Sequence, residues 1–334
     1  MAFEDRYNRA QFPVTLGAPV VFKLNKGDKV LSGKIIVTGI LTITGDGAPG
    51  TKIGDNALVN LVRRVLVVGN KAGGSRYYNG ALVNCSAQSL LRFAMSQRSG
   101  KYLDDLFGQT LGDGAAGVYQ VYLEIPIYFA TKQSLGGYST ALNMDPVDSQ
   151  GNRVYSSVQI RVDFAQLLTE LFAGSANAMA FAGMCEWRDD RLAIQTDTTP
   201  LVQEDHELFI QNANWRLVDD AMPADGNFLQ WLIMAQQGTP GWQLSDNLIN
   251  EIRAQGSTLN LKEYWQDTRA EMIDSGFFDP SQTLTGLFFF DWTHGLLANS
   301  NPAVGLQHEF SVNNPSGAGE DRLRIYTRRA YPLA

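Results

Sequence analysis

Strand-like patterns recur in the same order in the middle and near the end of the chain. Residues 121–129 form a bulky run of β-branched and aromatic side chains, and residues 157–164 alternate apolar and polar positions with a period of two. Near the C-terminus, residues 287–292 repeat the bulky run and residues 322–327 form a closing strand. The pattern predicts one strand–loop–strand–turn–strand unit used twice, in which 121–129 matches 287–292 and 157–164 matches 322–327.

The middle positions of this unit are residues 141–144 in the first copy and residues 307–312 in the second. Upstream, the apolar runs at 19–24 and 34–44 predict strands, and Gly39 inside the second run suggests a bulge or bend. Residues 58–68 are apolar nearly throughout, which fits either a strand buried on both faces or a helix that runs into a strand.

Helical periodicity is confined to a few segments. Residues 86–97 carry an apolar stripe, and Ser86 is placed to cap this helix, so the Asn84-Cys-Ser86 sequon is interpreted as a helix start rather than a glycosylation site. The corresponding helix of the second half is predicted over residues 245–254, with a further amphipathic piece over 261–273.

About eight strand candidates and one helix group fall in each half of the chain. Strands do not alternate one-to-one with helices, which disfavours a doubly wound α/β sheet. The predicted fold class is all-β with a few helices, built as two tandem eight-stranded jelly-roll β-barrels in one chain. The expected boundaries are an N-terminal arm over residues 1–13, a first jelly roll over 14–172 and a second over 173–334.

Composition narrows the function. The 334 residues carry a net charge of −7, which argues against wrapping or sequence-specific binding of nucleic acid, since both need Lys and Arg to replace counterions. Charged residues make up only 18% of the chain, which indicates surface that is neutral or covered by partners. Cys85 and Cys185 are far apart in sequence and are predicted to be free. The charged segment 1–12 does not resemble a signal peptide, and no apolar run is long enough to span a bilayer.

No group of residues forms a recognisable active site. His206, His294 and His308 lack partners three or four residues away, so neither a metal site nor a catalytic set is predicted. Adjacent carboxylates on a strand point to opposite faces, so neighbouring acidic pairs are expected on solvated loops and not in shared sites; the pairs are Asp104-Asp105, Asp189-Asp190, Asp219-Asp220 and Glu320-Asp321. The prediction is therefore no catalytic, cofactor-binding or metal residue and no cofactor.

The aromatic run Phe288-Phe289-Phe290 with Trp292 has two interpretations. It could form a platform for stacking sugars, or it could belong to the core and an interface, because alternate residues of a strand face opposite ways. The second interpretation is favoured. The loop 45–52 has a phosphate-loop composition in the wrong order, because Thr51 precedes Lys52, and it is interpreted as a turn.

The duplicated pattern resembles the double jelly-roll major capsid proteins of tailless icosahedral phages with an internal membrane, and of adenovirus. The resemblance rests on residues 121–129 and 157–164, their echoes at 287–292 and 322–327, and the helices expected ahead of each unit. It covers nearly the whole chain and is a resemblance of architecture, because the family has no invariant motif.

The resemblance implies a structural protein and not an enzyme. Such chains assemble in threes into pseudo-hexagonal capsomers that tile an icosahedral shell. Expected partners are two further copies of the chain, neighbouring capsomers, penton and minor capsid proteins, and the internal viral membrane through the arm at residues 1–13. The expected location is the virion, after assembly in the host cytoplasm. The alternatives are a two-domain β-sandwich that binds or cleaves carbohydrate, and a metal-dependent double-barrel enzyme, which the histidine pattern disfavours.

Overall fold

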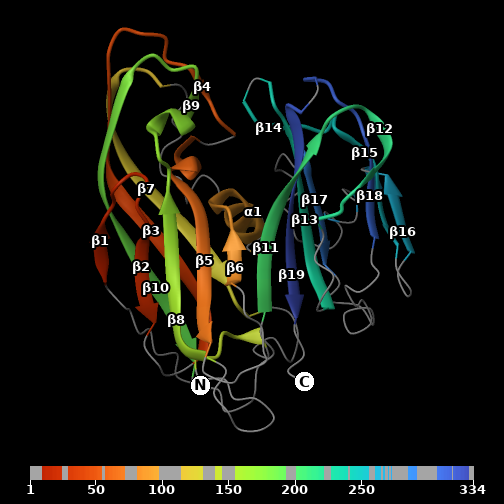
Figure 1. Cartoon of the computed structure of the whole chain (residues 1–334), viewed down its shortest axis with the longest axis horizontal. Helices are drawn as coiled ribbons and strands as arrows, with labels where there is room; N and C mark the ends of the chain where they lie inside the picture. Colours follow the sequence, from red (N-terminus) through yellow and green to blue (C-terminus); the bar gives the residue numbers. More distant parts are fainter. Residues whose placement is uncertain are drawn as a thin grey trace. The chain divides into compact units, whose positions relative to one another are not determined.

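The computed structural model describes residues 10–24, 29–54, 57–71, 81–97, 114–130, 140–144, 155–192, 201–221, 227–239, 241–255, 260–264, 266–267, 270, 272, 285–291, 307–317 and 319–330. Apart from short segments near residues 95–101 and the C-terminus, the chain divides between Val202 and Gln203 into two compact units. Each unit is a sandwich of antiparallel strands (Figure 1).

Eight strands make the sandwich of unit 1. In chain order they are β1 (Gln11–Pro13), β2 (Val20–Leu24), β3 (Lys29–Thr44), β5 (Val62–Lys71), β6 (Ala81–Cys85), β7 (Gly117–Tyr128), β8 (Tyr155–Phe164) and β10 (Ala178–Leu192). Two further short strands, β4 (Thr51–Lys52) and β9 (Phe172–Ala173), pair with each other beside them. One sheet has the order β1-β10-β3-β7, and in the other β2, β8, β5 and β6 are neighbours in that order.

Unit 2 is assembled from β11 (Leu201–Ile210), β12 (Asn214–Val218), β13 (Asn227–Gln237), β15 (Ile249–Gln255), β16 (Asn260–Tyr264), β17 (Leu287–Asp291), β18 (Gln307–Val312) and β19 (Asp321–Ala330). The short strand β14 (Gln243–Leu244) pairs with the end of β13. One sheet has the order β12-β18-β15-β16, while β11, β19, β13 and β17 are neighbours in the other.

The two units share one topology. When the eight strands of each unit are numbered along the chain, both units have one sheet in the order 1-8-3-6 and the other in the order 2-7-4-5. This crossing of connections between two antiparallel sheets defines the eight-stranded jelly roll. The predicted fold of two tandem jelly rolls in an all-β chain is therefore confirmed.

The strand assignments correct the predicted repeat by one strand. Residues 121–129 and 287–292 do correspond, because β7 and β17 are both sixth strands. Residues 157–164, however, form a seventh strand that matches β18 and not residues 322–327. Leu142 makes only an isolated bridge to Val30 instead of forming a middle strand. The strand of unit 1 that corresponds to β19 is β10. Each is the last strand of its unit and lies between the first and third strands of its sheet.

The same correction changes the predicted boundaries of the arm and of the two jelly rolls. β10 pairs with β3 over its whole length, from Ala178 opposite Thr44 to Leu192 opposite Lys29, so it belongs to unit 1. The division falls after Val202 and not after residue 172. Residues 11–13, assigned to the arm from the sequence, form the first strand of the sandwich. Residues 1–9 of that arm lie outside the described residues.

Two other strand predictions can be compared with the structure. Residues 58–68 are a 3-10 helix, η1 (Ala57–Leu61), that runs into β5, so the second of the two interpretations is confirmed. Gly39 marks no bulge, because the register of β3 is continuous there on both sides. A Cβ on Gly39 would instead lie 2.4 Å from the carbonyl oxygen of Ala182, so this residue permits close packing inside the sandwich.

The helix prediction was right for unit 1; in unit 2 the helix predicted over 245–254 is wrong, while the amphipathic piece predicted over 261–273 starts within β16 and contains helical residues. α1 (Ala87–Gln97) follows β6, and its apolar stripe, including Leu90 and Phe93, is buried. Residues 249–254 of the predicted helix lie instead in β15 (Ile249–Gln255). The helical residues of unit 2 include Gln266 and Met272, which follow β16 as α1 follows β6. A short amphipathic strand and one helical turn have similar apolar spacing, which explains the error.

Replacing the N-cap of α1 tests the assignment of this helix. The Ser86 hydroxyl oxygen accepts a hydrogen bond from the backbone N–H of Ser89 at 3.2 Å. We expect Ser86→Ala to lower the free energy of unfolding by about 1 kcal/mol, because a buried N–H loses its acceptor. Urea denaturation measures the change. Ser86→Thr retains the hydroxyl and should recover most of it; equal losses in both variants would contradict the capping role.

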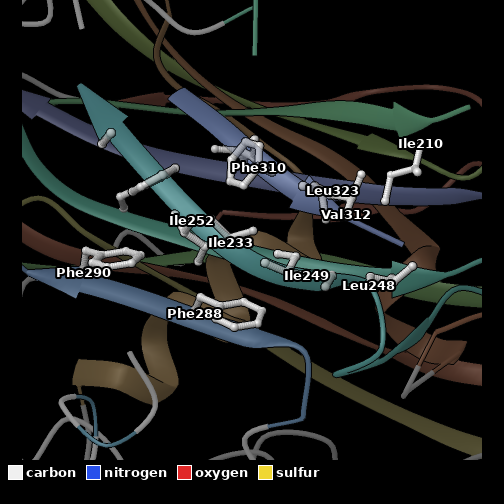
Figure 2. Packing of buried hydrophobic residues seen from close by; sticks show 14 of the residues in the cluster. Ile210, Ile233, Leu248, Ile249, Ile252, Phe288, Phe290, Phe310, Val312 and Leu323 are labelled. Atoms are coloured by element: carbon white, nitrogen blue, oxygen red, sulfur yellow. The ribbon is translucent and has the colours of Figure 1, made fainter. Parts of the chain in front are cut away.

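Each sandwich has its own core. In unit 2, inward side chains from both sheets form one buried cluster, and Figure 2 shows how they interdigitate. Its labelled members are Ile210, Ile233, Leu248, Ile249, Ile252, Phe288, Phe290, Phe310, Val312 and Leu323. Alternate residues on the same strands therefore face away from the core, and these outward faces are where partners can bind.

Candidate interaction surfaces

The sheet β1-β10-β3-β7 of unit 1 presents an outward face without charge, called here the neutral face. Its residues lie in three cross-strand rows set by the register, and nine of the ten are exposed while Thr42 is half-buried. The rows are Val118–Thr42–Ala180, Gln120–Ile40–Ala182 and Tyr122–Thr38–Met184–Pro13. Val118 is 71% exposed and Ile40 48%, which is high for large apolar side chains on regular strands.

Charged residues begin in the row that follows the neutral face. Glu124 and Glu186 lie on either side of Ile36, and both are buried. The Lys34 Nζ lies 3.2 Å from a carboxylate oxygen of Glu124, and the Tyr122 hydroxyl donates a 3.0 Å hydrogen bond to it. Burial, followed by the charge of Glu124, raises the pKa of the Tyr122 phenol. The charges on this side of the face are thus held in local pairs and leave the three rows beside them neutral.

The sheet β12-β18-β15-β16 of unit 2 presents a different outward face, called here the aromatic–arginine face. It comprises Trp215, Arg216, Glu251, Arg253, Lys262, Tyr264, Glu309 and Ser311. Trp215 is 69% exposed and Tyr264 54%, and the guanidinium carbon of Arg253 lies 5.9 Å from the centroid of the Trp215 ring. Both aromatics are amphipathic side chains of the kind that anchor protein interfaces.

An ion-pair lattice connects the strands of this face. The guanidinium of Arg216 lies 2.7 Å from a carboxylate oxygen of Glu309, and Arg253 lies between Glu309 and Glu251. The hydrogen bond from Arg253 lowers the pKa of the Glu251 carboxyl. Lys262 adds a third cation, so three cations face two carboxylates and the face has an excess of one positive charge. That sign is opposite to the −7 of the whole chain.

Inside unit 2, His308 on β18 is fully buried against two aromatic rings. Its ring centroid lies 4.2 Å from that of Trp231 and 5.6 Å from that of Phe228. Among the residues that the structure describes, neither of its ring nitrogens has a hydrogen-bond partner. Burial lowers the pKa of the imidazole to about 3, although the charge of Asp219 acts in the opposite direction.

The other histidine that the structure describes lies close to this one. His206 on β11 pairs its Nε2 with the Asp219 carboxylate at 2.8 Å, and the Asp219 backbone N–H donates to the carbonyl oxygen of His308 at 2.9 Å. Within the described ranges, no three His, Cys, Asp or Glu side chains gather in a way that could hold a metal ion. His294 lies outside the described residues.

The members of each described acidic pair do separate, but the expectation that the pairs lie on solvated loops is wrong for Asp189 and Asp321, which are buried in β10 and β19. Asp189 is buried and accepts hydrogen bonds from Nε and Nη2 of Arg191, both at 2.9 Å. Asp190 is exposed and accepts a hydrogen bond from Ser32. Asp321 is buried and accepts backbone N–H groups of Gly238 and Ser316, which closes turns rather than forming a site. Asp104 and Asp105 lie outside the described residues.

The cysteines and phenylalanines named in the sequence analysis are buried side chains that pack inside the units. Cys85 and Cys185 are buried thiols outside any disulfide, as expected, and burial raises the pKa of the Cys185 thiol to about 12. Phe288, Phe289 and Phe290 form β17 and are buried, so they belong to the core as predicted. Sequence reasoning did not identify the two outward faces. The signal for the neutral face was present in the absence of charge from residues 35–44 of β3 and 117–123 of β7, but only the register shows that these residues share a face.

No described helix is long and apolar enough to cross a membrane. No family model matches the sequence, and no curated protein matches it either.

The fold, by contrast, has clear counterparts among solved structures, and these are double jelly-roll capsid proteins. The chain is similar to the major capsid protein of Sulfolobus turreted icosahedral virus, with a TM-score of 0.69 and 10% identity, covering 100% of this chain and 97% of that one. It is similar to the major capsid protein P2 of bacteriophage PM2, with a TM-score of 0.52 and 10% identity over 97% of this chain and 98% of that one. The Faustovirus major capsid protein matches with a TM-score of 0.54 and 8% identity over 98% and 90% of the two chains.

Proposed function

We propose that this chain is the major structural protein of an icosahedral virus capsid. The observation that supports it is the same 1-8-3-6 and 2-7-4-5 strand order found twice in one chain, matched over nearly the full length of three capsid proteins. Two jelly rolls in tandem give a building block with two similar bodies, so three copies supply six bodies around a threefold axis. Such a trimer can occupy positions of local sixfold symmetry in a shell.

The proposed partners follow from that role. They are two further copies of the chain, neighbouring capsomers, and the penton and minor capsid proteins that complete a closed shell. The segment ahead of β1, residues 1–10, is proposed to reach a neighbouring capsomer or the internal membrane. The proposed location is the virion, with assembly in the host cytoplasm, and the proposed role is structural and not enzymatic.

The exposed faces of the sheets support self-association. The two outward faces expose the large side chains Val118, Ile40, Trp215 and Tyr264 on regular strands, and such side chains gathered on one face mark surfaces that bind partners. The carbohydrate-binding alternative is not supported by the aromatic run, because the phenylalanines considered for sugar stacking are buried in β17.

Size-exclusion chromatography with light scattering on the full-length protein tests the proposal. We expect a stable particle of three times 36.8 kDa, and electron micrographs of that particle should show a ring of six bodies. A protein that stays monomeric at all concentrations, or one that cleaves or retains glycans as a monomer, would overturn the proposal.

A further inference from the structure

The two outward faces differ in chemistry in a way that indicates how copies of the chain bind one another. The neutral face has ten residues without a charge, although the chain as a whole carries −7. Loss of charge is the feature that distinguishes the buried centre of an interface from ordinary surface, because covering a neutral residue desolvates no ion. This face can therefore be covered at little electrostatic cost.

The neutral face also has room for large side chains. Ala180 and Ala182 are exposed along β10, next to Ile40 on β3. Short side chains beside a larger apolar one give a flat platform on which an aromatic ring can lie, and the neutral face itself has only Tyr122 to supply such a ring. A complementary partner would therefore contribute exposed aromatic residues.

The aromatic–arginine face has the required aromatics. Trp215 and Tyr264 stand out from unit 2, and Arg253 is fixed against Trp215 by its pairs with Glu251 and Glu309. Tryptophan, tyrosine and arginine are the residues most enriched at the centres of protein interfaces. Because the lattice already pairs these charges, docking on an uncharged face breaks no ion pair.

Contact between two like faces is less favourable than contact between unlike faces, and this holds for each of the two faces. Two aromatic–arginine faces would bring two net positive charges together, with Arg216 and Lys262 half or more exposed on each face. Two neutral faces would form a twofold contact and leave Trp215 and Tyr264 uncovered. Contact between unlike faces buries both apolar patches at once, and a contact between unlike patches closes into a ring when its rotation permits.

We propose that the neutral face of one copy binds the aromatic–arginine face of the next copy, and that this contact closes the trimer. The inference rests on the proposed capsid function and names the surfaces through which the copies associate.

Two variants, each changing one face, test the proposal. Val118→Lys with Ile40→Lys places cations on the neutral face, opposite Arg216 and Lys262 of the neighbour. Trp215→Ser with Tyr264→Ser removes the aromatic anchors of the other face. Each is expected to weaken self-association by about tenfold or more and to leave monomers in light scattering. All four positions are exposed, so both proteins should fold, and circular dichroism together with thermal melting checks this.

Mixing the two variants distinguishes unlike from like pairing. Each variant retains one intact face, and the intact faces are complementary, so an equimolar mixture should form a one-to-one dimer while each protein alone stays monomeric. The control is Leu167→Lys, which adds one lysine at a residue that is 65% exposed but lies on neither face. It should form trimers like the unmodified chain.

The outcomes separate this inference from the proposed function. If the unmodified chain forms no trimer, the proposed function fails. If it forms trimers but either face variant does so with unchanged affinity, or if the mixture yields no dimer, the assignment of the faces is overturned while the capsid role stands.

Discussion

Lowering the pH from 6.5 to 4 is expected to remove about 3 kcal/mol from the stability of unit 2 through His308 alone. The imidazole has a pKa of about 3 in the folded protein and about 6.5 when exposed, because burial against Trp231 and Phe228 disfavours the charged ring. The unfolded chain therefore binds the proton first. The stabilisation is complete above pH 6.5 and is lost as the pH falls from there towards 3.

Urea denaturation followed by tryptophan fluorescence at several pH values measures this slope, since Trp231 contacts the histidine. The matched variant is His308→Phe, which retains an aromatic ring among aromatic rings and has no proton to bind. Its free energy of unfolding should depend less steeply on pH across this window, while His206 and Asp219 stay in place. If both proteins give the same slope between pH 4 and 6.5, His308 is not the group responsible.

Placing a side chain at Gly33 is expected to destabilise unit 1 strongly. A Cβ there would lie 1.9 Å from the Cη2 atom of Trp187, whose ring is fully buried. The indole cannot move aside easily, because its Nε1 donates a 3.0 Å hydrogen bond to Asp189, and Arg191 holds that carboxylate in turn. We expect Gly33→Val to cost about 3 kcal/mol or more, measured by urea denaturation or by loss of soluble protein.

The same strand supplies a control for Gly33. Thr38→Val introduces the same residue on the outward face of β3, where Thr38 is exposed, and should leave the stability nearly unchanged. In a double-mutant cycle, Trp187→Ala should relieve part of the cost of Gly33→Val, because the new methyl groups enter the space of the missing ring. A cost that simply adds in the double variant would show that the two side chains do not compete for space.

The sequence allowed the fold class to be predicted because period-two alternation is a local property. β2, β3, β7 and β8 lie where the alternation and the β-branched or aromatic runs placed them, although β3 begins five residues earlier than expected, at Lys29. The matching of strands between units is not local. β8 and β19 have similar alternation, but only the pairing of β10 with β1 and β3 shows that the first jelly roll still lacked its last strand at residue 172.

The interaction surfaces could be predicted only in part. The low charge of the chain indicated surface covered by partners, and the absence of catalytic motifs favoured a structural role. Ile40, Val118 and Ala182 are far apart in sequence, and only the register of three strands brings them onto one face. Trp215 could not be placed from its sequence, because a register shift between Asn214 and Leu217 disturbs the alternation of β12.

The position of the last strand in each jelly roll affects how the protein can be made. β10 lies between β1 and β3, and β19 lies between β11 and β13, so in each unit the segment synthesised last occupies the interior of a sheet. On the ribosome, β1 and β3 therefore cannot pair with β10 until residue 192 has emerged. During this interval their unpaired edges can bind other nascent chains. Fast synthesis of many copies would make this interval the step at which chaperones are most needed.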